Sequence, residues 1–117
     1  MQVVFESRDP DAALLRELAE RRLRFVLRRL TWLVPRAKVQ LTDINGPRGG
    51  VDKQCQVELK TGQHGTVLIT VVASDWRGAL EQALARAAQS ALKALRRQTE
   101  RQQPRLRAAK LARPTLS

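Results

Sequence analysis

Hydrophobic and polar residues alternate in four short segments, which is the pattern of β-strands with one buried face. The segments span residues 2–7, 38–43, 54–60 and 66–73. In the third segment Cys55, Val57 and Leu59 point to one side, and the polar residues between them point to the other. Each predicted strand has a single apolar face, so the sheet needs a covering layer on one side only.

Two further segments have the spacing of amphipathic helices. The first opens with Asp9-Pro10-Asp11, in which a cap residue precedes a proline suited to the first helical position, and it runs to about residue 30. The second runs from Ser74 to Gln103, with Ser74 or Asp75 as its cap. The expected inward stripes are Leu15, Ala19, Leu23, Val26 and Leu30 in the first helix, and Trp76, Leu80, Ala83, Leu84, Ala87, Ala91 and Leu95 in the second.

The order of these elements is β-α-β-β-β-α. The first two strands are joined through a helix and should be parallel, whereas the later strands should pair as antiparallel hairpins. With both helices on the apolar side of a four-stranded sheet, the predicted fold class is α+β, a two-layer sandwich resembling double-stranded-RNA-binding domains. Residues 1–103 should form one domain, and the basic tail 104–117 should be disordered in isolation.

Positive charge dominates the chain. Lysine and arginine number 22 against 11 acidic residues, a formal net charge of +11, which favours nucleic acid first and an anionic membrane surface second as the partner. The glycine-rich loop over residues 44–53 adds Arg48 and Lys53 and is expected to be mobile. Basic positions opposite or beside the apolar stripes are Arg21, Arg22, Arg24, Arg28 and Arg29 in the first helix, and Arg86, Lys93 and Arg97 in the second.

No residue pattern indicates catalysis, a cofactor or a metal site. Cys55 is the only cysteine and is expected to be a small buried hydrophobe, and His64 is the only histidine and lies in a turn. The glycines of loop 44–53 lack both the residue pattern and the strand-to-helix context of a phosphate-binding loop. We therefore expect neither enzyme activity nor a small-molecule substrate.

The chain shows no sign of a membrane or export signal. Its first ten residues lack the basic and apolar regions of a signal peptide, and no apolar run approaches the roughly 18 residues of a membrane span. A cytoplasmic protein without membrane contact is the prediction.

Aromatic residues are few. Phe5 and Trp76 are assigned to the core, so base stacking on a sheet platform is not expected. Phe25 lies among arginines, where it can stack on a base, but our interpretation is that Trp32 or the tail covers it. The composition fits better with helix arginines that bind phosphates and recognise the shape of the RNA than with base stacking.

One junction carries a family resemblance. It reads Ala73-Ser74-Asp75-Trp76-Arg77-Gly78-Ala79-Leu80-Glu81-Gln82-Ala83. Together with the β-α-β-β-β-α order and the basic first helix, it resembles the ribosome hibernation promoting factors, also called ribosome-associated inhibitor A or the sigma-54 modulation protein family. The second helix of that family commonly opens with Asp, a hydrophobic or aromatic pair, then Ala-Ile/Leu-Asp/Glu-x-Ala. The matching residues are Asp75, Trp76, Ala79, Leu80, Glu81 and Ala83, and the resemblance covers roughly residues 1–98.

The resemblance implies a short-form translation inhibitor of stressed or starved cells. Such a factor binds the small ribosomal subunit, and hence 16S-type rRNA, in the channel for messenger and transfer RNA. The position of Arg96 in the second helix adds it to the basic residues that the resemblance implies contact rRNA. Arg8 matches the arginine of a Gly-Arg pair that precedes the first helix in that family, although Ser7 replaces the glycine. The tail is too short for the separate domain that pairs ribosomes in the long form, so a monomer or weak homodimer is expected.

Two other hypotheses stay open. One is a general binder of structured RNA or DNA, which would bind free duplex about as well as ribosomes. The other is a protein-interaction module that docks an acidic partner, or forms a homodimer through Leu14, Leu18 and Phe25.

Overall fold

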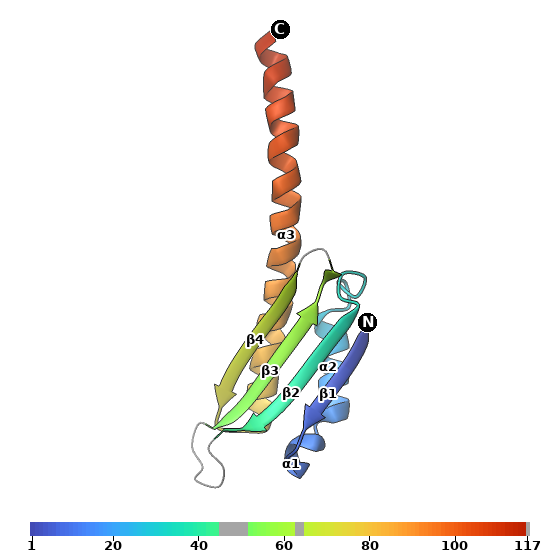
Figure 1. Cartoon of the computed structure of the whole chain (residues 1–117), viewed down its shortest axis with the longest axis vertical. Helices are drawn as coiled ribbons and strands as arrows, with labels where there is room; N and C mark the ends of the chain where they lie inside the picture. Colours follow the sequence, from blue (N-terminus) through green and yellow to red (C-terminus); the bar gives the residue numbers. More distant parts are fainter. Residues whose placement is uncertain (45–51, 63–64, 117) are drawn as a thin grey trace.

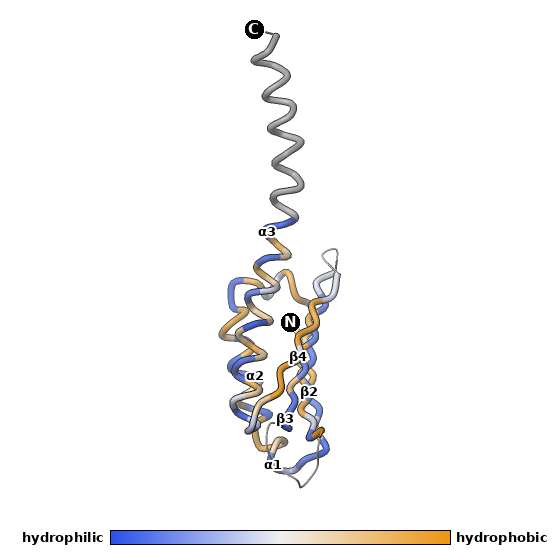
Figure 2. The backbone as a smooth tube through the Cα atoms, turned by 90° about the vertical axis from the view of Figure 1, so that its left-hand side faces the viewer, coloured by the Kyte–Doolittle hydropathy of each residue, from blue (hydrophilic) through white to orange (hydrophobic). Residues whose placement is uncertain are grey.

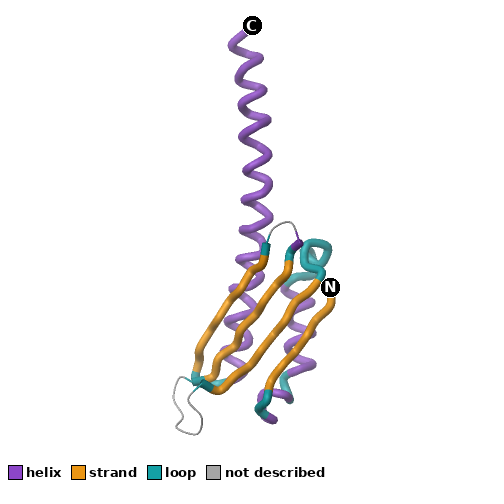
Figure 3. Tube along the Cα trace, viewed as in Figure 1, coloured by secondary structure: helices purple, strands orange, loops and turns teal. Residues whose placement is uncertain are grey.

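The chain folds as a four-stranded sheet with helices at its back (Figures 1 and 3). The computed structural model describes residues 1–44, 52–62 and 65–116, with side chains described up to residue 97. The elements in chain order are β1 (Gln2–Ser7), α1 (Pro10–Ala13), α2 (Arg16–Val26), β2 (Arg36–Asp43), β3 (Lys53–Lys60), β4 (Thr66–Ala73) and α3 (Trp76–Leu116).

The strand order in the sheet is β1-β2-β3-β4. β1 pairs in parallel with β2, and the other two pairings are antiparallel, which confirms the predicted topology. The register brings apolar residues into one row across the sheet, from Phe5 through Val39 and Val57 to Ile69. β2 and β3 begin two residues and one residue earlier than predicted, because pairing of Arg36 with Lys60 and of Asp43 with Lys53 extends the ladder at both ends.

Two layers enclose the core, as predicted. Viewed edge-on, α2 and α3 lie together on one side of the sheet, and no described segment covers its other side (Figure 2). Leu23 of α2, Leu80 and Leu84 of α3, and Val57 of β3 are buried between the layers. Burying a leucine completely contributes about 1.5–3 kcal/mol, so the apolar stripes fix which face each element turns inward.

The first helix is interrupted, which the sequence did not predict. α1 ends at Ala13 and α2 starts at Arg16. The amide of Leu15 donates to the carbonyl oxygen of Ala12 at 2.9 Å, and this tight turn takes the acceptor that a continuous helix would offer to Arg16. Leu14, between the two helices, is 82% exposed.

The segment after α2 also departs from the predicted helix, which was to continue to Leu30. The amide of Leu30 donates to Leu27 at 2.7 Å and that of Leu33 donates to Leu30 at 2.9 Å, so each bond spans three residues. A period of three places residues 27, 30 and 33 on one side, and all three leucines are buried. The predicted inward residue Val26 is only half-buried, because Leu27 takes its place in the core.

α3 has the predicted start and a later end. The Asp75 carboxylate accepts from the Gly78 amide, which identifies Asp75 as the cap. The helix runs without a break to Leu116, beyond the end expected at Gln103, and projects past the sheet (Figure 1). The segment 104–116, expected to be disordered in isolation, is therefore the last part of α3 in this structure, and its behaviour in isolation stays a prediction.

Candidate nucleic-acid interface

The five predicted arginines of the first helical segment are all exposed. Among the described side chains, Arg22 alone of the five forms an ion pair, with Glu81 of α3 at 3.5 Å, and both side chains are close to half exposed. The Nη1 atoms of Arg24 and Arg28 donate to backbone carbonyl oxygens, of Met1 at 3.3 Å and of Phe25 at 2.9 Å. No described carboxylate pairs with Arg21, Arg24, Arg28 or Arg29. Their guanidinium groups are therefore available to bind the phosphates of a polyanion.

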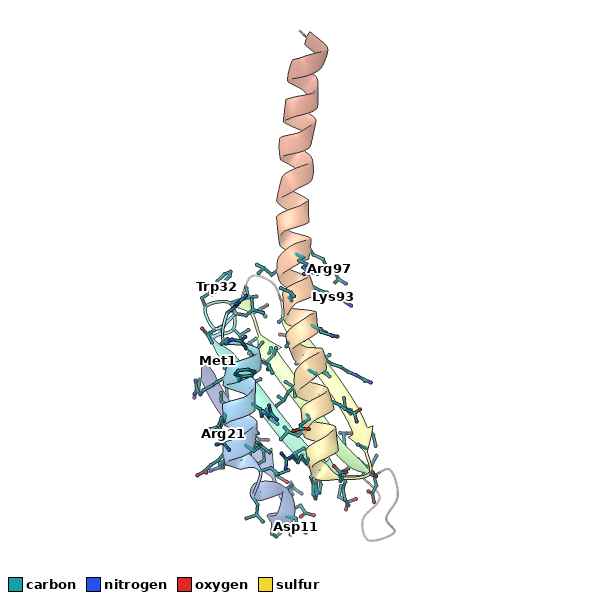
Figure 4. All side chains as sticks on the ribbon, turned by 180° about the vertical axis from the view of Figure 1, so that it is seen from behind. Met1, Asp11, Arg21, Trp32, Lys93 and Arg97 are labelled. Atoms are coloured by element: carbon teal, nitrogen blue, oxygen red, sulfur yellow. The ribbon has the colours of Figure 1, made fainter. Side chains whose placement is uncertain are left out.

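The contacts of α2 fix where its arginines point. Arg22 reaches α3 on one flank, and Arg24 reaches the start of β1 on the other. Because successive residues are rotated by about 100° in a helix, Arg21 lies between these flanks and nearly opposite the buried Leu23. Arg21 therefore faces away from the sheet on the outer side of the helical layer, the side viewed in Figure 4.

The predicted basic residues of α3, Arg86, Lys93, Arg96 and Arg97, are exposed as well. Figure 4 shows Lys93 and Arg97 extending from the side of α3 that faces away from α2. Arg86 lies seven residues before Lys93, which returns it to the same flank. The two basic groups therefore point in different directions and do not merge into one patch.

Arg8 lies apart from both groups. It lines an open cleft of about 1030 Å³ at the carboxyl ends of β1 and β2. The cleft is also lined by Arg16, Glu6, Asp9 and Asp43. The Cζ atom of Arg16 lies 5.9 Å from the centre of the Phe5 ring. Two arginines and three carboxylates share the cleft, so it lacks the positive excess of the helical surface.

The prediction that Lys53 belongs to a mobile loop is wrong, because Lys53 is the first residue of β3. Its Nζ atom is 2.8 Å from Asp43 and 3.4 Å from the fully buried Asp52, and it lies 5.2 Å from the centre of the Trp76 ring. The hydrogen bond to Asp43 raises the pKa of Lys53 above its ordinary value. Its charge is neutralised within the fold, so we withdraw it as a nucleic-acid contact. Arg48, the other basic residue of that loop, and His64 lie outside the described residues.

The expectation that Trp32 or the tail covers Phe25 is also wrong. Phe25 is 57% exposed and Trp32 is 69% exposed, so neither Trp32 nor the tail covers Phe25. The Cζ atom of Arg28 lies 4.5 Å from the centre of the Phe25 ring. Of the residues named for a possible homodimer, Leu14 and Phe25 are exposed, whereas Leu18 is half-buried.

A basic group on the uncovered face of the sheet was missed by the sequence analysis. Arg36, Lys38 and Lys60 line a small hollow of about 120 Å³ together with Glu58. Arg36 and Lys60 are paired residues of β2 and β3, and like charges directly opposite each other destabilise a sheet. The signal was present in the alternation of β2 and β3, since outward positions in both strands carry basic residues, but their adjacency depends on the register.

Cys55 is fully buried, as predicted, and burial raises the pKa of its thiol to about 12. A neutral, enclosed thiol is a poor nucleophile. Within residues 1–44, 52–62 and 65–97, whose side chains the structure describes, no group of three histidine, cysteine or acidic side chains is placed to hold a metal ion. No helix in the described part of the chain has the length and hydropathy needed to cross a bilayer.

No protein-family model matches this chain, and no curated protein matches it either. The resemblance to the ribosome hibernation factors therefore rests on the residues of the sequence.

Proposed function

We propose that this protein is a ribosome-associated translation inhibitor that binds small-subunit rRNA through the outer surface of its helices. The observation that carries the proposal is the set of exposed arginines on and just after α2, of which Arg21, Arg24, Arg28 and Arg29 have no ion-pair partner among the described carboxylates. Arginine binds phosphate through a planar fork of donors, and each neutralised phosphate releases counterions.

The directions of the basic groups support binding inside an RNA-lined channel. Arg21 faces outward from α2, and Lys93 extends from the flank of α3 that faces away from α2. A flat partner would touch only one of these two surfaces. An enclosing partner meets both at once, and the messenger and transfer RNA channel implied by the family resemblance is such a partner.

A second candidate is a general binder of structured RNA or DNA. The basic group of Arg36, Lys38 and Lys60, on the opposite side of the sheet from the helices, favours it. A protein with positive charge on both layers and a net charge of +11 binds polyanions without needing a specific site.

Co-sedimentation with purified bacterial small subunits separates the two candidates. The protein is titrated against subunits over a salt series, with free duplex RNA of equal phosphate content as competitor. Saturable binding near one protein per subunit that survives excess duplex supports the ribosomal function. If the duplex competes in proportion to its phosphate content, the protein is a general polyanion binder. The ribosomal function would then be abandoned.

Protection of rRNA from hydroxyl radicals then tests the channel. Bound protein should protect nucleotides that line the messenger and transfer RNA path, and transfer RNA should compete with it. Protection confined to the outer surface of the subunit would contradict the proposed site.

A further inference from the structure

Two aromatic side chains remain exposed at one end of the helical layer. Phe25 lies in the last turn of α2 and Trp32 lies in the turns that follow, and they are 57% and 69% exposed. Burying either ring in the core would have stabilised the fold, because aromatic side chains remove a large area from water. Exposed aromatic rings among arginines are found where proteins stack on the bases of nucleic acids.

A hydrogen bond orients the Trp32 ring, and the Arg28 guanidinium lies over the Phe25 ring. The Nε1 atom of Trp32 donates to the carbonyl oxygen of Arg29 at 3.0 Å, which orients the indole. Arg28 donates to the carbonyl oxygen of Phe25 at 2.9 Å, and its guanidinium stacks on the Phe25 ring with 4.5 Å from Cζ to the ring centre. Rings fixed before binding lose little conformational entropy on binding. The hydrogen bond also occupies the indole N–H, so the ring faces are the part of Trp32 left for a partner.

The surrounding charge identifies the partner. Arg21, Arg24 and Arg29 are exposed on the same segment and lack an ion pair with any described carboxylate. A second copy of the chain would bring like charges together on this surface, which opposes association. Flat aromatic faces among arginines are the combination that binds single-stranded nucleic acid, in which bases stack on rings while arginines contact phosphates.

We propose that Phe25 and Trp32, with the guanidinium of Arg28, form a stacking platform for unpaired bases of RNA. The inference rests on the proposed function in taking rRNA as the partner, and it deepens that function by specifying the RNA feature. Duplex bases keep their faces inside the helix, so the platform selects loops, bulges or single strands. Stacking accepts any base, so little sequence preference is expected.

The test compares two single strands that carry the same phosphates. One is a mixed-sequence RNA oligonucleotide of about twelve nucleotides, and the other has the same backbone with abasic residues at its centre. The Trp76→Phe variant is used for a fluorescence titration, because it leaves Trp32 as the only tryptophan. We expect the base-containing strand to quench Trp32 and to bind roughly 25- to 100-fold more tightly than the abasic strand, about five- to tenfold for each ring.

Variants assign the difference to the two rings, and their affinities are measured by the anisotropy of a dye on the RNA strand, because a substitution at Trp32 removes the tryptophan signal. Phe25→Leu and Trp32→Leu keep an apolar side chain without an aromatic face, and each should reduce the preference for the base-containing strand by roughly five- to tenfold. Trp32→Phe should restore much of it. Leu14→Ala is the matched control, since it removes exposed apolar surface from the same layer and should change nothing. Thermal melts of each variant establish that the fold is intact.

Equal affinity of the native protein for the two strands would overturn the platform, as would a preference that survives both leucine variants. The same variants are sedimented with small subunits. Subunit binding together with equal strand affinities would refute the platform alone, whereas a preference for bases without subunit binding would refute the ribosomal function alone.

Discussion

Neutralising the outer arginines should change the salt dependence of RNA binding without unfolding the protein. The variant carries Arg21→Gln, Arg24→Gln and Arg29→Gln. Arg28 is left in place because it stacks on Phe25, and Arg22 because it pairs with Glu81. All three substituted side chains are exposed and lack a described ion pair, so each should change the free energy of unfolding by less than about 0.5 kcal/mol.

The expected magnitude follows from counterion release. Each phosphate contact contributes about 0.7 to 0.9 to the slope of log affinity against log salt. If each arginine contacts one phosphate, the slope should become shallower by about 2 to 3. Between about 50 and 200 mM salt, the affinity of the native protein should then fall roughly 20- to 40-fold more than that of the variant.

The assay measures affinity for small subunits at five or more salt concentrations. The control variant carries Arg36→Gln, Lys38→Gln and Lys60→Gln on the uncovered face of the sheet. It removes the same charge and breaks only the exposed ion pair of Lys38 with Glu6, at 3.4 Å. Comparison of the two variants separates a local contact from an effect of net charge.

Three outcomes would count against this reasoning. An unchanged slope in the helix variant would mean that α2 does not face the RNA. Equal loss in both variants would mean that net charge governs binding, as for a general polyanion binder. A loss of thermal stability of more than about 2 kcal/mol would mean that these arginines hold the fold together.

Three further predictions concern other parts of the chain. Lys53→Met should destabilise the protein, because it leaves the buried Asp52 without its cation, whereas Lys60→Met at the exposed end of the same strand should have little effect in the same urea unfolding series. Cys55 should react with a thiol reagent only as fast as the protein unfolds. Because burial raises its pKa from 9.0 to about 12, stability should fall as pH rises above 9, and Cys55→Ala should flatten this alkaline loss in thermal melts. Deletion of residues 104–117 should weaken RNA binding and flatten its salt slope at an unchanged melting temperature, and a lower melting temperature would show that this segment packs on the domain.

Most of the sheet followed from local pattern. Alternation along β2, β3 and β4 predicted the inward rows of residues such as Val39, Val57 and Val71, and the short connections predicted antiparallel pairing. These features depend on the two-residue period of a strand, which is visible in any sequence window. A cap at Ser74 or Asp75 was visible for the same reason, since capping is a local interaction, and the structure selects Asp75.

The helical segment before β2 was less predictable. A single 3.6-residue period was assumed up to Leu30, but the chain tightens to a three-residue period after α2 and buries Leu27 and Leu33. Both arrangements satisfy the backbone hydrogen bonds, and packing against the sheet decides between them.

Some features of the candidate site could likewise be predicted from the sequence, whereas others depend on tertiary structure. The helical period was enough to place Arg21 and Lys93 away from the core, because rotation about a helix axis is fixed by the number of intervening residues. The ion pairs of Lys53, the opposition of Arg36 and Lys60, and the exposure of Phe25 and Trp32 each depend on a neighbour elsewhere in the chain or on the path of the turn after α2.

Local sequence pattern was enough to predict the element order, the apolar faces and the outward direction of the arginines on the helices, and composition gave the excess of positive charge. Tertiary structure alone decided which of those charges are neutralised, which lie side by side across strands, and which aromatic rings stay exposed. The physical reason is range: periodicity and capping act within a few residues, whereas charge pairing and burial are set by segments brought together only when the sheet and its helices pack.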